Sequence, residues 1–273
     1  GMRPNSSLSS LSLLRDLAQD LCVCLRFWSR LPVPVLPWEA EPHGMPDFAR
    51  CSRMLPVAGT IIGAFGALAL LAASTLGAPA SVAAGLGLAA SILATGAFHE
   101  DGLADTADGL GGGANRQRKL EIMKDSRIGT YGGAALVLSL GLRWSALAAI
   151  LETQGALATA LAMIAVAAFS RVAGLIPAVA LEPARADGAA QAAGKPGESA
   201  MWIACALALA ISGALIALAM EPRDWAIATV VALAGPLLMT RLARKQIGGQ
   251  TGDIAGACQQ LAEIGFLVAL ASR

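Results

Sequence analysis

The chain has 273 residues, of which 56% are hydrophobic and 14% charged, and its mean hydropathy is +0.62. A soluble domain usually carries about 25% charged residues, so this composition excludes an ordinary soluble domain and a disordered chain. The 20 Lys and Arg residues nearly balance the 19 Asp and Glu residues, so no nucleic-acid surface is expected. The sequence therefore predicts a polytopic membrane protein.

The first predicted element is an amphipathic helix within residues 8–31. Apolar residues recur there at helical spacing, with charged residues between them: Leu11, Leu14, Leu17, Ala18, Leu21 and Leu25. Such a helix lies either on the membrane surface or against the protein core, and both interpretations stay open. Pro32 and Pro34 follow it and end the helical pattern.

Seven later stretches are apolar enough to cross a bilayer, which takes about 20 residues. The sixth is short and contains Pro236, which leaves its ends undefined. The sequence thus predicts an all-α bundle of about 6–7 transmembrane helices, forming one integral-membrane domain over residues 1–273. The expected spans are residues 54–76, 79–98, 133–151, 156–181, 201–220, 225–240 and 254–271.

The positive charges predict the orientation of these spans. Sixteen of the 20 Lys and Arg residues lie in the N-terminal region and in the predicted loops 99–132, 182–200 and 241–253. The loops between the other span ends are very short and contain one Arg, Arg223. Because cytoplasmic loops carry the excess of Lys and Arg, we expect the long loops to face the cytoplasm.

Loop 99–132 begins with a run of acidic residues. On a continuous helix, Asp101, Asp105 and Asp108 are four and three residues apart and share one face. Three close carboxylates repel one another unless a divalent cation binds them, and oxygen ligands favour Mg²⁺. Glu100 adds a fourth acid, whereas His99 lies about 160° from Asp101 and is a poor co-ligand. The alternative is a solvated acidic helix end.

The same loop continues into a basic, glycine-rich segment. Lys119, Lys124 and Arg127 supply donors for anionic oxygens, and Arg127 belongs to an Asp-Ser-Arg-x-Gly-Thr pattern. Carboxylates that bind metal beside such a segment are typical of phosphoryl transfer. The alternative, a basic anchor for the next span, explains the charge but not the pattern.

A second polar run, Gly248 to Asp253, precedes the last span. Its glycines allow backbone N–H groups to converge on an anion at a helix N-terminus. Thr251 or Asp253 could cap that helix, and Asp253 could also bind a metal. An ordinary capped loop is the alternative.

Three charged residues fall inside predicted spans: Arg143, Arg171 and Glu263. A charge at membrane depth points to a functional site or to a buried partner. Two interpretations therefore stay open, that they contact substrate and that they pair with one another.

Taken together, these motifs resemble the cobalamin synthase (adenosylcobinamide-GDP ribazoletransferase) family over nearly the whole chain. The motifs begin at Phe27-Trp28-Ser29-Arg30-Leu31-Pro32-Val33-Pro34 and continue with HxDGLADTxDG at 99–109, LEIMKDSRIGTYG at 120–132, Ser170-Arg171, and GGQTGD at 248–253. Residues 182–200 match the family poorly, and no role is predicted for them.

The resemblance implies a Mg²⁺-dependent enzyme of the bacterial inner membrane. It would join adenosylcobinamide-GDP to α-ribazole, or to its 5′-phosphate, and release GMP. The implied catalytic residues are His99, Asp101 and Asp105. The implied metal ligands are Asp101, Asp105, Asp108, Glu100 and Asp253, and the implied substrate-binding residues are Ser126, Arg127, Thr130, Arg171, Gln250, Thr251 and Gly252. The expected partners are these substrates and the lipid bilayer; whether the chain forms a homo-oligomer stays open.

Three rival classes share parts of this pattern. CDP-alcohol phosphotransferases require an Asp-Gly-x-x-Ala-Arg continuation, which does not follow Asp108-Gly109. Prenyltransferases use Asp-bound Mg²⁺ but do not need the Asp-Ser-Arg-x-Gly-Thr run. A transporter would show internal repeats with matching broken helices, and no convincing repeat is found.

Overall fold

The computed structural model describes residues 6–273 of the chain, which form α-helices, one short 3₁₀ helix, and no strand. The all-α prediction is therefore confirmed. The 3₁₀ helix, Ser52–Met54, joins α2 to α3. The α-helices are α1 (Ser6–Trp28), α2 (Phe48–Cys51), α3 (Leu55–Thr75), α4 (Ala80–Thr95), α5 (Phe98–Gly112), α6 (Arg116–Met123), α7 (Thr130–Gln154), α8 (Ala156–Ala173), α9 (Ile176–Ala180), α10 (Ala189–Ala193), α11 (Glu198–Ala217), α12 (Pro222–Ile247) and α13 (Gly252–Ala271).

Six helical segments are long and apolar enough to cross a membrane, or seven if the bent pair α4–α5 counts as one span. This agrees with the predicted 6–7 transmembrane helices. The six are Phe48–Thr75, Thr130–Gln154, Ala156–Ala180, Glu198–Ala217, Pro222–Ile247 and Gly252–Ala271.

The sixth predicted span was too short, and the predicted loop 241–253 is wrong over most of its length. Helix α12 continues through Pro236 to Ile247, and only residues 248–251 separate it from α13. Proline is tolerated inside a membrane helix where side chains bind the freed backbone groups. Pro236 removes the donor for the Ala232 carbonyl one turn earlier. The Thr240 hydroxyl adds a hydrogen bond of 2.7 Å to the Pro236 carbonyl in the following turn.

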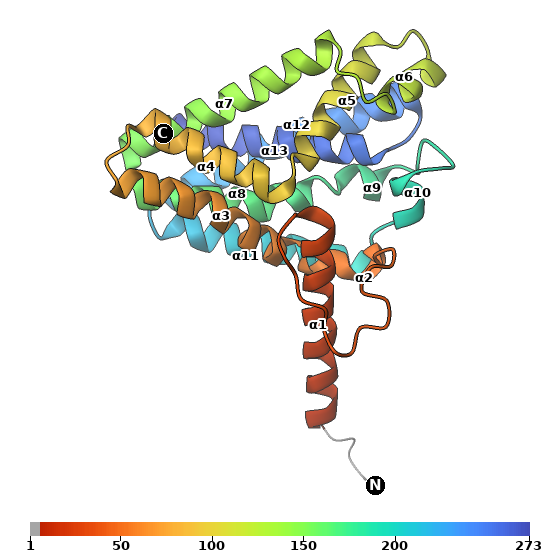
Figure 1. Ribbon diagram of the computed structural model, residues 1–273, viewed down its shortest axis with the longest axis horizontal. Helices are drawn as coiled ribbons and strands as arrows, with labels where there is room; N and C mark the ends of the chain where they lie inside the picture. The colour runs from red at the N-terminus through yellow and green to blue at the C-terminus, as the bar shows by residue number, and fades with distance from the viewer. Residues whose placement is uncertain (1–5) are drawn as a thin grey trace.

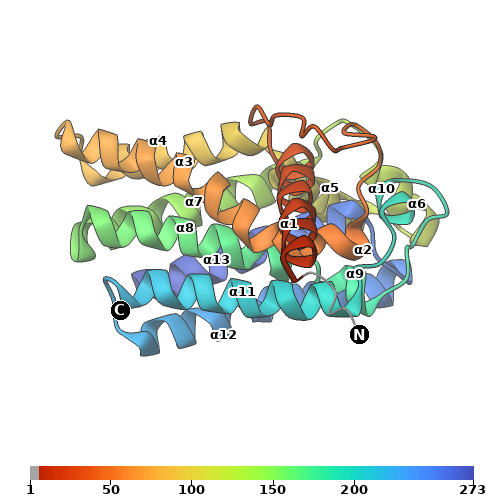
Figure 2. The ribbon, with the colours of Figure 1, turned by 90° about the horizontal axis from the view of Figure 1, so that it is seen from below.

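The long helices form one bundle whose two ends differ (Figures 1 and 2). The short connections α3–α4, α7–α8 and α11–α12 lie at the end that contains the C-terminus, on the left in both views. Helices α5, α6, α9 and α10 gather at the opposite end. The sequence assigned these two sets of connections to opposite sides of the membrane. We call the end with α5 and α6 the polar end.

Helix α1 projects from the side of the bundle, across its long axis (Figure 1). Its last turns are buried: Cys24 and Trp28 pack against Phe48 and Leu55. Its earlier part is exposed, with Leu14 at 63%. Both interpretations of this helix therefore hold in part, since it packs at one end and presents an amphipathic surface at the other.

Small residues allow the central helices to touch. Helix α8 forms the most buried span, with 83% of its apolar window inside the bundle. A Cβ atom on Gly59 of α3 would collide with the Ala167 carbonyl of α8, and one on Gly63 would lie 2.6 Å from the Ala167 Cβ. These contacts fit membrane packing, in which small residues let backbones approach.

A sharp bend separates α4 from α5. The two helix axes differ by 87°, because Gly96 (φ 64°) and Ala97 (φ 57°) are both left-handed. A Cβ atom on Gly96 would lie 2.7 Å from Nε of Arg30, so the N-terminal segment packs directly on the bend. The acidic run is helical as predicted, but this bend, and not a straight continuation of α4, directs it. Helix α5 therefore crosses the polar end of the bundle and lies outside the six long spans.

Candidate active site

Three carboxylates lie near enough to influence one another electrostatically where α5 crosses the start of α13. Asp101 is exposed and Asp105 is half-buried on α5, and Asp253 lies in the first turn of α13. The two helices are in close contact here, since a Cβ atom on Gly102 would lie 3.0 Å from the Asp253 carbonyl oxygen. We call Asp101, Asp105 and Asp253 the carboxylate cluster.

The cluster is electrostatically unfavourable without a cation. Burial, followed by the charges of Asp101, Asp253 and Asp108, raises the pKa of Asp105 to about 7. Among the described residues, no three His, Cys, Asp or Glu side chains form a ready-made metal site. The donor set nevertheless fits a hard divalent ion, because it consists only of carboxylate oxygens, and an ion would remove their repulsion.

Asp108, the third predicted ligand on α5, caps another helix. Its Oδ2 accepts a 2.6 Å hydrogen bond from the Gly129 N–H, and its Oδ1 accepts a 2.8 Å bond from the Gly132 N–H. A Cβ atom on Gly129 would lie 2.5 Å from Asp108 Oδ1, and one on Gly132 would collide with Asp108 Oδ2. Neither position therefore has room for a side chain. Asp108 thus fixes the loop before α7 to α5, and this explains the glycines that follow Arg127.

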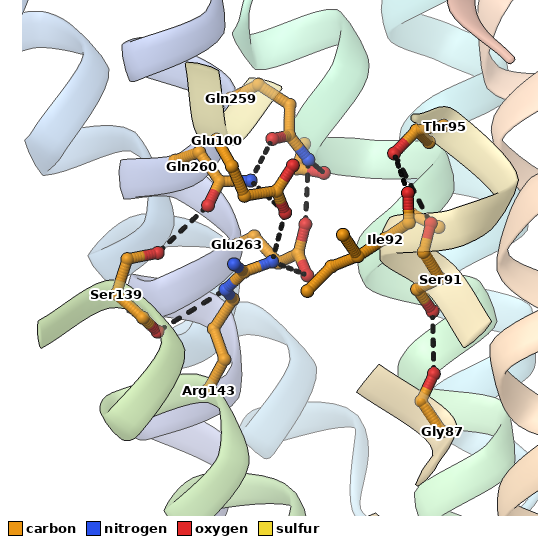
Figure 3. A network of polar contacts seen from close by, with 12 residues as sticks. Gly87, Ser91, Ile92, Thr95, Glu100, Ser139, Arg143, Gln259, Gln260 and Glu263 are labelled. Carbon is orange, nitrogen blue, oxygen red and sulfur yellow. Dashed lines mark hydrogen bonds and ion pairs between the residues drawn. The ribbon is translucent and has the colours of Figure 1, made fainter. Parts of the chain in front are cut away.

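Glu100 belongs to a separate buried network (Figure 3). Arg143, which is 1% exposed, places Nη1 at 3.0 Å from Glu100 Oε1 and 3.2 Å from Glu263 Oε1. Gln260 Nε2 also donates to Glu100, at 3.4 Å, and its Oε1 accepts from the Ser139 hydroxyl at 2.9 Å. Glu100 therefore serves as an ion-pair partner inside the bundle, apart from the carboxylate cluster. The structural pairing expected as an alternative for Arg143 and Glu263 is confirmed.

Arg171 does not join this pairing. Its Nη1 donates to the Ala167 carbonyl of its own helix at 2.8 Å, and no ion pair is found for it within the described residues. It lines a cavity together with His99, Gln250 and Gly252. Burial, and then the charge of Arg171, lowers the pKa of His99 well below its usual value, so the imidazole is neutral at pH 7. His99 thus lines this cavity as a neutral imidazole.

The predicted substrate-binding residues of the first loop lie on the surface of the polar end. Ser126, Arg127 and Thr130 are exposed, and Thr130 begins α7. Arg127 Nη2 lies 2.6 Å from Asp125 Oδ2, and its side chain is 87% exposed. Asp108 holds this loop against α5. Because the Arg127 side chain is exposed, a substrate can reach it from the solvent.

The second run is a capped turn tied to the segment that had no predicted role. The Gln250 N–H donates to the Glu182 carbonyl at 2.9 Å, and the Ala184 N–H donates to the Gln250 carbonyl at 2.8 Å. The Thr251 hydroxyl accepts from the Ile254 N–H at 3.2 Å, which confirms Thr251 as the cap of α13. Residues 182–184 therefore fix the backbone of the turn.

Two cations that the sequence did not single out complete this end. Arg185 Nη2 lies 3.1 Å from Asp253 Oδ2, beside the carboxylate cluster. Arg116 donates to the Ala184 carbonyl at 2.6 Å and to the Ile247 carbonyl at 2.8 Å. Their positive charge was the one available signal, because their partners are 68 or more residues distant along the chain. A second cavity, lined by Arg185 and Asp253, adjoins the first and shares Gln250 and Gly252 with it.

Comparison with known proteins covers nearly all of the chain. A family model described as cobalamin-5-phosphate synthase matches residues 20–271. A protein of Azorhizobium caulinodans called adenosylcobinamide-GDP ribazoletransferase is 50% identical over 254 residues, which is 91% of this chain and 94% of the relative. Proteins of the same name from Xanthobacter autotrophicus and Bradyrhizobium diazoefficiens are 48% identical (93% and 96% covered) and 44% identical (95% of each covered). No solved structure matches the chain.

Proposed function

Because the chain belongs to the cobalamin-5-phosphate synthase family, we propose that it is an adenosylcobinamide-GDP ribazoletransferase of cobalamin synthesis. It would join adenosylcobinamide-GDP to α-ribazole, or to α-ribazole 5′-phosphate. The products would be adenosylcobalamin, or its 5′-phosphate, and GMP. The single observation that carries the chemistry is the carboxylate cluster, three acids beside an exposed arginine loop and a cavity that contains a neutral histidine.

The reaction exchanges one phosphorus–oxygen bond for another. A ribose hydroxyl of the nucleoside attacks the phosphorus that bears the cobinamide. The bond from that phosphorus to the bridging oxygen breaks, and GMP leaves with the oxygen. The hydroxyl proton passes to a base on the protein, for which we propose His99, because its imidazole is neutral and its cavity adjoins the cluster.

Asp101, Asp105 and Asp253 would hold Mg²⁺, which when bound neutralises the charge of the diphosphate and of the leaving oxygen. Asp108 and Glu100 are left out of this set, because their oxygens already accept hydrogen bonds from α7 and from Arg143. Asp108 instead positions the arginine loop. The pKa of Asp105 is raised in the absence of metal. A bound cation would restore the ionised carboxylate, which fits its role as a ligand.

The cationic side chains would bind the anionic part of the substrate. Arg127 is exposed on the loop that Asp108 holds, and Ser126 and Thr130 flank it with hydroxyl groups. Guanidinium groups bind phosphate oxygens through paired hydrogen bonds. Gln250, Thr251 and Gly252 line the neighbouring cavity together with Asp253 of the cluster.

We also propose a multi-pass inner-membrane protein whose polar end faces the cytoplasm. The basic residues of the polar end, including Arg116, Lys124 and Arg185, support this orientation through the positive-inside rule. Nucleotide substrates of the cytoplasm would then reach the carboxylate cluster directly.

The test is the metal-dependent release of GMP. Detergent-solubilised protein is incubated with adenosylcobinamide-GDP and α-ribazole, with Mg²⁺ or with EDTA, and GMP is measured. We expect GMP with Mg²⁺ and none with EDTA, and α-ribazole 5′-phosphate in a parallel reaction determines which acceptor is preferred. Absence of Mg²⁺-dependent GMP formation would overturn the proposed function.

The matched variants are Asp105→Asn and Glu152→Gln. Both remove one negative charge, but Glu152 is an exposed residue in the last turn of α7, and the α7–α8 connection lies at the end of the bundle opposite the polar end. Asp105→Asn should abolish turnover while the protein still unfolds in one cooperative transition, and Glu152→Gln should behave as the wild type. Activity retained in Asp105→Asn would contradict its role as a ligand.

A further inference from the structure

The cavity that contains Arg171 and His99 has an aromatic wall. The chain has 6 Phe, 5 Trp and 1 Tyr, and four of these rings line this cavity: Phe27, Trp28, Phe48 and Phe98. They meet edge to face, with centroids 4.8 Å apart for Phe27–Trp28 and 5.7 Å for Phe27–Phe98. The rings come from α1, α2 and α5, so the fold gathers them from distant parts of the sequence. We call this space the aromatic cavity.

The facing wall contains a buried donor without an acceptor. Arg171 is 6% exposed, and its buried Nε has no hydrogen-bond partner in the described part of the chain. The two acids in the same part of the bundle, Glu100 and Glu263, are both ion-paired with Arg143. A buried donor left unpaired is costly, so the guanidinium of Arg171 is suited to a ligand that brings an acceptor.

The charges around Arg171 favour a neutral ligand. Arg143 and Arg171 carry two positive charges, which Glu100 and Glu263 balance. None of the described residues that line the cavity is acidic. A phosphate group here would add an uncompensated buried charge, which is expensive in an apolar environment. A neutral ring with one acceptor nitrogen would add none.

The hydrogen bonds of Gln259, one of the polar residues of the cavity, make it a poor partner for guanine. Guanine presents several N–H donors that need acceptors. The Gln259 carbonyl oxygen already accepts from Gln260 at 2.8 Å, and its amide nitrogen donates to Glu263 at 2.7 Å and to Ser170 at 2.9 Å. A benzimidazole ring attached to a ribose needs one hydrogen-bond donor from the cavity and no acceptor, because it is flat and apolar apart from one free ring nitrogen.

We propose that the aromatic cavity binds the benzimidazole ring of the acceptor nucleoside, between the four aromatic side chains and Arg171. This assignment rests on the proposed function and names the position of one of its two substrates. The aromatic cavity shares Gln250 and Gly252 with the cavity that contains Asp253. A ribose attached to the bound ring is therefore directed toward the carboxylate cluster, where its hydroxyl reacts.

The test measures binding without turnover. Purified protein in EDTA is titrated with α-ribazole, and separately with GDP, by equilibrium dialysis. Phe98→Ala should weaken α-ribazole binding about tenfold, since stacking on one aromatic ring contributes roughly that much. GDP binding should not change. Phe65→Ala is the control, because Phe65 lies on the outer face of α3 and is 45% exposed.

A second variant fills the cavity and removes no side chain. Ala178 lines the aromatic cavity and is partly exposed, so Ala178→Phe should block it and also weaken α-ribazole binding while the protein stays folded. Unchanged α-ribazole binding in both variants, or weakened GDP binding in place of it, would overturn the assignment. A wild-type protein that binds α-ribazole in the aromatic cavity but forms no GMP would refute the proposed function and leave the binding assignment standing.

Discussion

Arg185 Nη2 lies 3.1 Å from Asp253 Oδ2, so a segment that matches no motif supplies a counter-ion to one of the proposed metal ligands. Both side chains are largely buried, at 16% and 23% exposed. We expect an arginine in this position to compete with a metal ion for the carboxylate and, when the ion binds, to turn toward the diphosphate. Arg185 is therefore expected to weaken the binding of Mg²⁺ and to strengthen the binding of the diphosphate substrate.

Arg185→Gln should separate these effects. The Mg²⁺ concentration for half-maximal activity should fall, because Asp253 loses its competitor. The KM for adenosylcobinamide-GDP should rise about tenfold, as expected for one lost charged hydrogen bond. Initial rates over a matrix of Mg²⁺ and substrate concentrations measure both values.

Lys195→Gln is the control for Arg185, because Lys195 is an exposed cation of the same segment, 3.9 Å from Glu182. It should leave both constants unchanged. A rise in the Mg²⁺ requirement of Arg185→Gln would show that the arginine supports the ion, contrary to this prediction.

The raised pKa of Asp105 predicts a pH dependence of stability in the metal-free protein. The carboxyl releases its proton near pH 3.8 in the unfolded chain and near pH 7 in the folded chain. Between these values the folded state binds more protons, so the free energy of unfolding falls as pH rises from 4 to 7. Asp105→Asn cannot ionise, so it should melt above the wild type at pH 8 and together with it near pH 4.

Melting curves in EDTA at a series of pH values check this prediction. Adding Mg²⁺ at pH 8 should then raise the melting temperature of the wild type and not that of Asp105→Asn. Identical curves for the two proteins at pH 8 without metal would contradict the raised pKa of Asp105.

The bend between α4 and α5 predicts opposite effects for two neighbouring substitutions. Gly96→Ala adds a Cβ atom at a φ of 64° and 2.7 Å from Arg30 Nε, so it should destabilise the fold by about 1–2 kcal/mol. Ala97→Gly relieves a non-glycine residue at φ 57° and should stabilise the fold by up to about 1 kcal/mol. Unfolding titrations of both variants in one detergent check the sign. Equal destabilisation by both would indicate that the bend does not depend on left-handed backbone.

The sequence could predict what depends on local periodicity and on the bilayer. Hydropathy identified the spans, since a helix in lipid must be long and apolar, and helical spacing placed Asp101 and Asp105 on one face. The same spacing puts Glu100 about 100° from Asp101. That offset was a usable signal that Glu100 faces the bundle and Arg143.

Contacts between distant segments could not be predicted. Asp108 caps a helix that begins more than 20 residues later, and Arg185 reaches Asp253 across 68 residues. Neither partner leaves a periodic trace in the sequence. The bend was also hidden, because Gly96 signals a helix end, whereas a left-handed Ala97 has no sequence signature.

The proposed orientation predicts the accessibility of two exposed positions. Gln117 lies on α6 at the polar end, and Arg223 lies at the start of α12 at the opposite end, with its side chain 80% exposed. In intact cells with a permeable outer membrane, a membrane-impermeant maleimide should label Arg223→Cys. It should label Gln117→Cys only after lysis, because the proposed orientation keeps the basic polar end in the cytoplasm.

The unmodified protein, labelled in parallel, measures the background from Cys22 and Cys205, which are partly exposed. The reverse labelling pattern would place the carboxylate cluster outside the cytoplasm. It would overturn the orientation while leaving the active-site assignment intact, because the cluster depends on the contact of α5 with α13 and not on the direction of insertion. Labelling of both positions in intact cells would contradict a single fixed orientation.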